Sequence, residues 1–286
     1  MKFKFKFKFT ILIFIVAAIA LFFARNENFI PRTTLDIYHH YINKTEASAV
    51  AGLTPEAALD IQKRVVYALS EKWGGIAGYK AALTNPEVQQ KMGVSEPLLG
   101  IFLDKMLLDS PATIQISSAV HPFAEADLLV RVRDASINEA TTDEELLAAI
   151  DQVIPFIEIP DRLYSTDKPL TLDMLTAINT GARYGVMGEP IPIEDIENLN
   201  WCQVGIVYDD KSHLQTGRCS SLMGNPVNVI RWLRDKLLKL NYPLKQGTLL
   251  SLGSLTSPIP IKKGRLTAGF TGLGSKPHVT VSVTFK

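Results

Sequence analysis

Three segments of the chain carry hydrophobic residues every three or four positions, with polar residues between them. This spacing is typical of amphipathic helices that bury one face. Each segment begins with a good helix N-cap residue, at Thr54, Thr142 and Asn225, and proline follows the first and the third. Thr142 also stands in a capping-box pattern with Glu145. The pattern therefore predicts helices over residues 54–73, 142–150 and 225–240.

Other segments alternate apolar and polar residues or form short apolar runs, as strands do. They cluster along the chain without regular alternation with helices, which favours an α+β fold over a doubly wound sheet. With 286 residues, 47% of them hydrophobic, the chain can bury a sizeable core. The predicted strands cover residues 78–84, 113–117, 125–132, 153–159, 201–208, 248–252, 266–270 and 278–285.

The first 25 residues differ in pattern from the rest. Lysines alternate with phenylalanines up to position 8, and an unbroken apolar run of 16 residues follows over 9–24. A basic start before an apolar run is typical of an export signal, but the run also suits an uncleaved anchor, so cleavage stays open. We therefore predict an exported protein, periplasmic, secreted or anchored by residues 9–24, with these parts: an export signal or membrane anchor at 1–25, a linker at 26–49 and a single domain at 50–286.

The charge balance changes when this segment is set aside. Residues 1–25 hold five of the 30 basic residues and none of the 29 acidic ones, so the remainder has a net charge of about −4. Nucleic-acid binding usually requires a basic face. The composition therefore predicts no nucleic-acid partner, and contact with a membrane only through the N-terminal segment.

Three carboxylates stand in segments that otherwise resemble buried strands. Glu125 and Asp127 are two positions apart, so their side chains project to the same face of a strand. Glu158 stands in the apolar run 153–159, where an isolated ionised carboxylate is costly. Oxygen ligands of this kind suit a hard divalent cation. The pattern fits equally well a solvated edge-strand face, with Glu158 paired to Arg162, so both interpretations stay open.

A lysine also stands inside a predicted strand. Lys80 lies within the segment 78–84, among small and apolar residues. A lysine in such surroundings can have a lowered pKa and serve as a proton-transfer group. A lysine at a strand edge with its amine in solvent is the plainer interpretation of this segment alone.

The two cysteines fall in a predicted hairpin. A polar four-residue turn that pairs Tyr208 with His213 also sets Cys202 opposite Cys219. Opposed residues of a non-hydrogen-bonded antiparallel pair lie about 4.5 Å apart at Cα, within disulfide range. We predict a Cys202–Cys219 disulfide in an exported protein; the alternative is two unpaired buried thiols.

Seven short segments are informative through their order and spacing. They cover residues 78–84, 88–94, 125–127, 158–159, 179–181, 219–228 and 253–256. In this order they resemble the hydratase/decarboxylase branch of the fumarylacetoacetate hydrolase superfamily. The resemblance extends over about residues 50–286 and implies that family's α+β fold, a mixed, layered β-roll with flanking helices, in a chain that forms homo-oligomers.

The resemblance also implies a metal site. It places Mg²⁺ or Mn²⁺ on Glu125, Asp127 and Glu158, where a small 2-oxo acid substrate would chelate the ion through its carboxylate and keto oxygens. Lys80 would act beside the metal as catalytic acid or base. Asp127 stands where the family typically has glutamate, which shortens that ligand arm by one methylene group.

Substrate contacts are implied at Asn179, Thr180, Gly181 and Thr256. The family's Asn-Ala-Ser is here Asn-Thr-Gly, so Thr180 would have to supply the hydroxyl that the family has at the next position. Leu98 replaces an aspartate in the family's Pro-Asp-Phe/Tyr-Gly segment. Both differences alter the polarity of the implied pocket.

The activity implied is a metal-dependent lyase, a hydratase that adds water to a small 2-oxo or 2-hydroxydienoic acid. A 2-oxo acid decarboxylase or an acylpyruvate hydrolase would fit the same residues. A hydrolase would need a base to activate water, and His121 is the nearby histidine, although a core or turn position suits it better. A further alternative, of a different class, is an exported protein that binds 2-oxo acids without catalysis.

Overall fold

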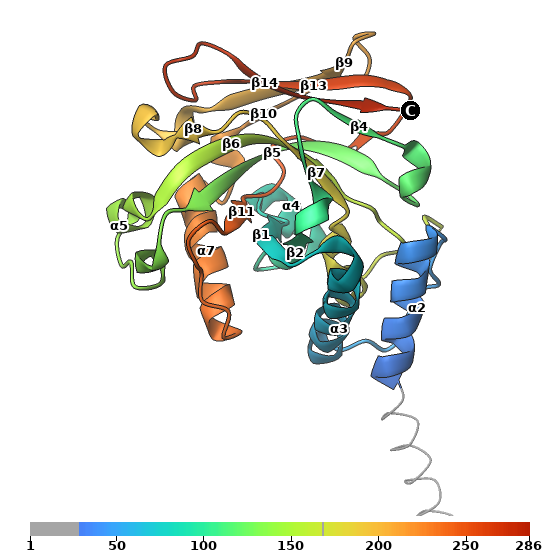
Figure 1. Ribbon diagram of the computed structural model, residues 1–286. Coiled ribbons are helices and arrows are strands. Elements are labelled where there is room, and N and C mark those ends of the chain that lie inside the picture. Colours follow the sequence, from blue (N-terminus) through green and yellow to red (C-terminus); the bar gives the residue numbers. More distant parts are fainter. Residues whose placement is uncertain (1–28, 168) are drawn as a thin grey trace, which may run out of the picture.

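Two β-sheets form the body of the structure, and helices cover one of them (Figure 1). The computed structural model describes residues 29–167 and 169–286. Within these residues the larger sheet contains the strands β1 Ile76–Ala82, β2 Leu98–Leu103, β3 Leu107–Asp109, β5 Phe123–Val132, β6 Ile150–Ile159, β7 Tyr184–Met187, β8 Ile191–Pro192, β11 Leu249–Ser251 and β12 Ile259–Pro260. The smaller sheet contains β4 Ala112–Ile114, β9 Gln203–Tyr208, β10 Gln215–Arg218, β13 Gly264–Thr271 and β14 Val279–Phe285.

The helices join these strands or lie against them. The α-helices are α2 Phe29–Asn43, α3 Pro55–Trp73, α4 Pro86–Met92, α5 Asp143–Ala148, α6 Leu172–Ala177 and α7 Pro226–Lys239. Short 3-10 turns are η1 Asp104–Met106, η2 Ile116–Ser118, η3 Ala135–Asn138, η4 Asn179–Gly181, η5 Ile193–Asp195, η6 Leu199–Trp201 and η7 Cys219–Ser221. Clustered strands with helices on one side confirm the predicted α+β class.

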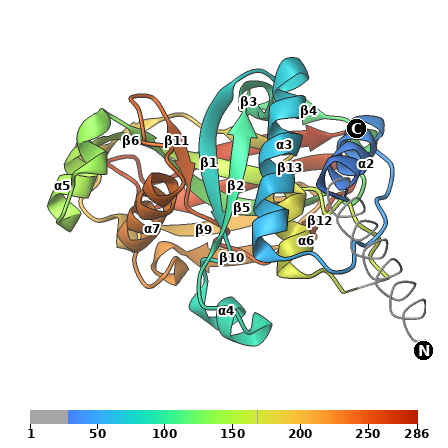
Figure 2. The ribbon, with the colours of Figure 1, turned by 90° about the horizontal axis from the view of Figure 1, so that it is seen from below.

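The larger sheet has the order β2-β1-β11-β5-β6-β7-β3, with β12 beside β5 and β8 beside β6. The smaller sheet has the order β10-β9-β13-β14-β4. In Figure 1 the smaller sheet lies above the curved strands β5 and β6, while α2, α3 and α7 lie below the larger sheet. Viewed from below in Figure 2, α3 and α7 flank the strands β1 and β2, and α4 projects beyond them. Strands β1, β11 and β5 therefore lie inside the larger sheet, with neighbours on both sides.

The N-cap signals of the sequence are confirmed. The Thr54 hydroxyl accepts a hydrogen bond from the Ala57 N–H at the start of α3. Thr142 and Glu145 form the predicted capping box at α5, and the Asn225 side chain caps α7. Polar caps before an apolar stripe thus placed three helices correctly.

Helix α2 was not predicted. Residues 26–49 are predicted as a linker, but Phe29–Asn43 within them is a helix that packs against α3. Ile37 and Tyr41, one helical turn apart, are both buried in the core. That apolar pair on one face is the signal that the sequence analysis missed.

The predicted exported or membrane-anchored location is wrong for the structure as described. No helix within residues 29–167 and 169–286 is both long enough and apolar enough to cross a membrane. The segment 1–25, on which that prediction rested, lies outside the described residues.

Candidate functional site

The three acids of the sequence analysis share one face of the larger sheet. Glu125 on β5 stands directly opposite Glu158 on β6, and Asp127 follows two positions along β5. Because side chains alternate along a strand, all three project to the same side. Strand β5 lies between β11 and β6, so these residues are not on an edge strand. Like charges in directly opposed positions destabilise a sheet unless a cation compensates them.

Burial changes the protonation of this group. Asp127 has 0% of its surface exposed and Glu158 2%, whereas Glu125 is half-buried. Burial, with the nearby Glu158 carboxylate as the next cause, raises the pKa of Glu125 to about 8 and that of Asp127 to about 7. Without a further cation, the pocket therefore favours protonated acids near neutral pH.

Lys80 supplies the cation that the structure places among these acids. Its side chain is only 2% exposed, and its Nζ donates to Glu158 Oε1 and, at 3.2 Å, to the Thr180 carbonyl oxygen. Lys80 is thus a buried ion-pair partner of Glu158, and the plainer interpretation of a lysine with its amine in solvent is wrong. Its strand β1 lies between β2 and β11, so the lysine does not sit at a sheet edge either.

Asp127 has partners of its own. The Ser251 hydroxyl on β11 donates to Asp127 Oδ2, and the Leu128 N–H donates to Oδ1, both at 2.5 Å. These two bonds lower the pKa of Asp127 and so oppose the effect of burial. The sequence analysis missed Ser251, although a hydroxyl inside the apolar strand segment 248–252 was a usable signal.

The turn η4 holds Lys80 from the other side. Asn179, Thr180 and Gly181 all adopt left-handed backbone angles, with φ of 57°, 53° and 70°. Left-handed backbone is unfavourable for residues with a Cβ, so the surroundings must impose it at the first two positions. The result is a sharp turn that aims the Thr180 carbonyl at Lys80 Nζ.

Side-chain hydrogen bonds fix this turn to the strand β2. Asn179 Oδ1 accepts from the Ile101 N–H at 2.9 Å, and its Nδ2 donates to the Ile101 carbonyl at 2.8 Å. The Thr180 hydroxyl donates to the Leu99 carbonyl at 2.7 Å. Gln62 on α3, which the sequence analysis did not single out, donates to that same carbonyl at 2.8 Å. The polar side chains of Asn179 and Thr180 therefore form hydrogen bonds within the protein.

The other two residues predicted to bind substrate lie near the acids or the turn. The Thr256 hydroxyl accepts from the Ala126 N–H, between Glu125 and Asp127, at 3.1 Å. At Gly181 an added Cβ would stand 3.2 Å from the Asp161 carbonyl oxygen, and its left-handed φ also favours glycine. Neither a serine nor an alanine would be relaxed at position 181.

The donor set suits a hard divalent cation, but the side chains do not converge on one point. No group of three or more His, Cys, Asp or Glu side chains is arranged to hold a metal ion anywhere in residues 29–167 and 169–286. Glu158 is engaged by Lys80 and Asp127 by Ser251. A divalent ion bound here would displace the protons of these buried acids and compensate the negative charge that they then carry. Such an ion would need Glu158 to turn from Lys80.

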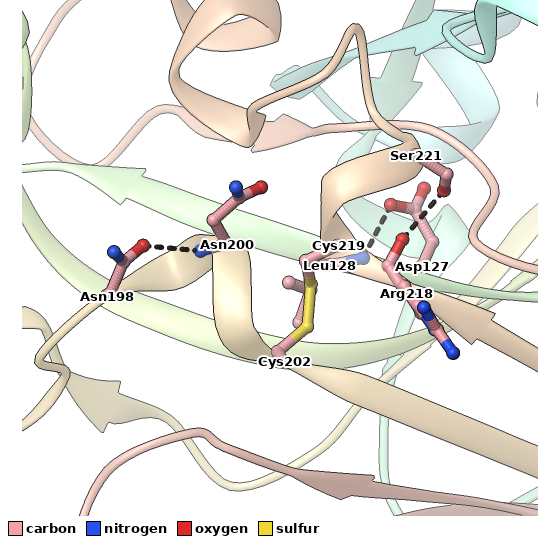
Figure 3. Close-up of a disulfide and its surroundings, with 8 residues drawn as sticks. All are labelled: Asp127, Leu128, Asn198, Asn200, Cys202, Arg218, Cys219 and Ser221. Atoms are coloured by element: carbon pink, nitrogen blue, oxygen red, sulfur yellow. Dashed lines mark hydrogen bonds between the residues drawn. A yellow bond between two sulfur atoms is a disulfide. The ribbon is translucent and has the colours of Figure 1, made fainter.

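The two cysteines form the predicted disulfide (Figure 3). Cys202 and Cys219 are fully buried, and their Cα atoms are 5.3 Å apart. Strands β9 and β10 have the register that the predicted hairpin requires, with Ile206 opposite Gln215. The bridge joins the residue before β9 to the residue after β10, so it closes the open end of this hairpin in the smaller sheet.

His121 takes no part in this group of residues. Its Nε2 lies 2.7 Å from Glu46 Oε2, and its backbone N–H donates to Asp161 Oδ1. It occupies a turn, as the sequence analysis favoured. His121 therefore does not supply the hydrolase alternative with a base beside the acids.

Known proteins with similar sequence or structure include a 2-keto-4-pentenoate hydratase and a 4-oxalocrotonate decarboxylase. No family model matches the chain. A 2-keto-4-pentenoate hydratase of Paraburkholderia phymatum is 30% identical over 203 residues, which cover 70% of this chain and 76% of that protein. The structure of 4-oxalocrotonate decarboxylase from Pseudomonas putida G7, complexed with magnesium and adipate, superposes with a TM-score of 0.80 at 22% identity, covering 90% of this chain and 97% of that one.

A more distant structure has the same fold. Fumarylpyruvate hydrolase from Pseudomonas aeruginosa, in complex with Mn²⁺ and pyruvate, has a TM-score of 0.57 at 14% identity, over 73% of this chain and 89% of that one. At 22% and 14% identity the structural similarity shows only that the fold is shared. The 30% sequence identity to the hydratase shows the closer relationship.

Proposed function

Because the chain belongs to the hydratase/decarboxylase branch of the fumarylacetoacetate hydrolase superfamily, we propose that it is a divalent-metal-dependent hydratase of small 2-oxo or 2-hydroxydienoic acids. One observation carries the proposal. Glu125, Asp127 and Glu158 gather with Lys80 on one buried sheet face, and this arrangement supports a metal site beside a proton-transfer group.

Mg²⁺ or Mn²⁺ is the ion that this donor set would hold, through Glu125, Asp127 and Glu158. Both ions prefer oxygen ligands, and related structures contain magnesium or manganese. When bound, the ion would supply Lewis-acid chemistry, which stabilises negative charge that develops on the 2-oxo group of a substrate. Asp127, buried and fixed by Ser251, would be the most rigid of the three ligands.

Lys80 is proposed as the group that moves the proton. Its Nζ is held by the Thr180 carbonyl, and Glu158 holds it while no other cation is present. Once Glu158 is engaged elsewhere, Nζ is free of this ion pair, and the amine would then take up or deliver a proton at the substrate. Its burial excludes bulk water from that transfer.

A 2-oxo acid decarboxylase is the second candidate. The neighbour with a TM-score of 0.80 is named as a decarboxylase, and loss of CO₂ would develop the same negative charge at the same place. A protein that only binds 2-oxo acids is the remaining alternative, which Leu98 and Gly181 motivate.

A turnover assay separates these candidates. We expect the purified protein with Mg²⁺ or Mn²⁺ to remove the diene absorbance of 2-hydroxypenta-2,4-dienoate, and EDTA to abolish that activity. Lys80→Met should lower kcat by at least about a hundredfold, in the range of general acid–base effects. Lys263→Met, at an exposed lysine, is the matched control and should retain full activity.

CO₂ release from a 2-oxo diacid would favour the decarboxylase, and tight 2-oxo acid binding without turnover of either substrate would favour the binding protein.

A further inference from the structure

A cavity of about 320 Å³ opens beside β2, between α3, α6 and the loop that follows α4. The proposed metal and proton-transfer groups do not line this cavity. Its walls are mainly aliphatic, and their apolar residues include Leu59, Val94, Pro97, Leu98, Leu99 and Leu172. A pocket with such walls is suited to an apolar group rather than to a charged one.

The cavity adjoins the proposed catalytic lysine. In the β1–β2 pair, Lys80 is opposite Gly100 and Ala82 is opposite Leu98. Opposed residues share a face and positions two apart do too, so Leu98 projects to the same side of the sheet as Lys80. On this face of the sheet, the cross-strand pair that contains Leu98 is therefore the next one to the pair that contains Lys80.

A second connection runs through Leu99. Its carbonyl accepts hydrogen bonds from Thr180 Oγ1 and Gln62 Nε2, which belong to the turn and the helix that frame Lys80. Helix α6, which contributes Leu172 and Thr176 to the cavity, leads directly into that turn. Leu99 and α6 thus connect the wall of the cavity to the turn beside Lys80.

The charges around the cavity disfavour an anionic occupant. Its charged lining residues are Glu96, Asp173 and Lys236. Lys236 Nζ is 3.2 Å from Glu96 Oε1, so the one cation of this lining is already paired with an acid. A carboxylate placed here would meet Asp173 without a free positive partner, at a cost in desolvation.

We propose that this cavity receives the distal arm of the substrate, and that the arm is an uncharged alkyl chain. The inference rests on the proposed function and adds the substrate class: a monocarboxylic 2-oxo or 2-hydroxydienoic acid longer than five carbons. A volume of 320 Å³ equals roughly ten water molecules. That is more room than the two-carbon end of a pentenoate requires. We therefore expect this chain to prefer an uncharged substrate end, unlike the decarboxylase whose structure contains adipate, a dicarboxylate.

Binding tests the proposal without relying on turnover. Calorimetry with the Mg²⁺-loaded protein would compare 2-oxopentanoate, 2-oxooctanoate and 2-oxooctanedioate. We expect 2-oxooctanoate to bind at least about tenfold more tightly than either of the others, because added methylene groups in an apolar pocket give such factors. The same order should appear in kcat/KM for the matching 2-hydroxydienoates.

Variants of the cavity wall should change this order. Leu98→Arg adds a cation, and we expect it to reverse the preference in favour of the dioate. Leu59→Arg does the same from α3, further from Lys80, and serves if the first variant fails to fold in a thermal melt. Leu214→Arg, at a leucine that is 60% exposed and outside the cavity, is the matched control and should leave the order unchanged.

The outcomes separate this inference from the proposed function. Turnover of several dienoates with equal or better use of the dioate would overturn the alkyl-arm proposal and leave the hydratase standing. A preference for 2-oxooctanoate in calorimetry without any turnover would support the cavity assignment and count against the hydratase. Equal affinity for all three 2-oxo acids in the wild type would also overturn the alkyl-arm proposal.

Discussion

Gly100 lies directly opposite Lys80, so close that a Cβ built on the glycine would stand 2.6 Å from Lys80 Cγ. On its other side the same Cβ would come within 3.1 Å of the Asn179 carbonyl oxygen. The lysine stem therefore lies in a gap that exists because position 100 has no side chain. The missing Cβ determines where the amine can stand.

Replacing Gly100 with alanine should displace Lys80. We expect kcat to fall by about a hundredfold, as shifts of about 1 Å at a catalytic group do, and stability to fall by about 1–3 kcal/mol through overpacking. Gly205→Ala is the control, since nothing lies within 4 Å of its added Cβ. Steady-state kinetics and a denaturant melt measure both effects. Full activity in Gly100→Ala would show that the lysine position is not sterically set.

Metal removal should make stability depend on pH. In the metal-free protein the pKa of Glu125 is raised from 4.5 to about 8 and that of Asp127 from 3.8 to about 7. The native state then holds protons that the unfolded chain has released, so the stability that these two acids contribute is fully present below about pH 4 and is lost as the pH rises to about 8. We expect the Tm in EDTA to fall by several degrees between pH 5 and pH 8.

Saturating Mg²⁺ should flatten that dependence, because it compensates the ionised acids, and its affinity should rise with pH as protons leave the ligands. Thermal melts with and without the ion at three pH values measure this. In Glu125→Gln the slope in EDTA should become smaller. Parallel Tm curves with and without Mg²⁺ would contradict a metal site at these acids.

Ser251 should act through Asp127. Removing its hydroxyl in Ser251→Ala takes away a hydrogen bond that lowers the pKa of Asp127. We therefore expect Mg²⁺ affinity near neutral pH to fall about tenfold, as with other residues that orient metal ligands. Ser220→Ala, at an exposed serine, is the matched control. Metal titration by calorimetry at two pH values would reveal the effect, and a larger loss at the lower pH would identify its cause.

The disulfide should stabilise the fold. Cys202 and Cys219 are 17 positions apart in the chain, and closing a loop of this size stabilises by about 3 kcal/mol in the chain-entropy account. The double variant Cys202→Ser/Cys219→Ser should therefore unfold at lower denaturant concentration. Reductant should shift the wild type in the same direction and leave the double variant unchanged. An identical midpoint for both proteins would contradict the prediction.

Local signals in the sequence were sufficient for elements that depend on their own residues. The caps at Thr54, Thr142 and Asn225 each formed, because a cap needs only the backbone of the next turn. The hairpin register that sets Cys202 opposite Cys219 followed from turn length alone. Alternation likewise put Glu125 and Asp127 on one face.

Contacts between distant segments could not be predicted in the same way. The ion pair of Lys80 with Glu158 and the bond of Ser251 to Asp127 depend on the strand order β1-β11-β5-β6, which local patterns do not encode. The same holds for Gln62, whose amide reaches the turn at Asn179 from another helix. Helix α2 escaped prediction because its buried face is narrow.

The parallel pairing of β1 with β11 has a consequence for the order of folding. It sets Lys80 beside Ser251, so strands from the first third and the last fifth of the chain must meet before the acidic face has all its partners. Loop closure over such a separation is slow compared with hairpin formation. On the ribosome, a nascent chain that already contains all three acids still lacks Ser251. The site is therefore completed only after Ser251 has been synthesised, and a product truncated before that residue would carry the acids without the frame that positions them.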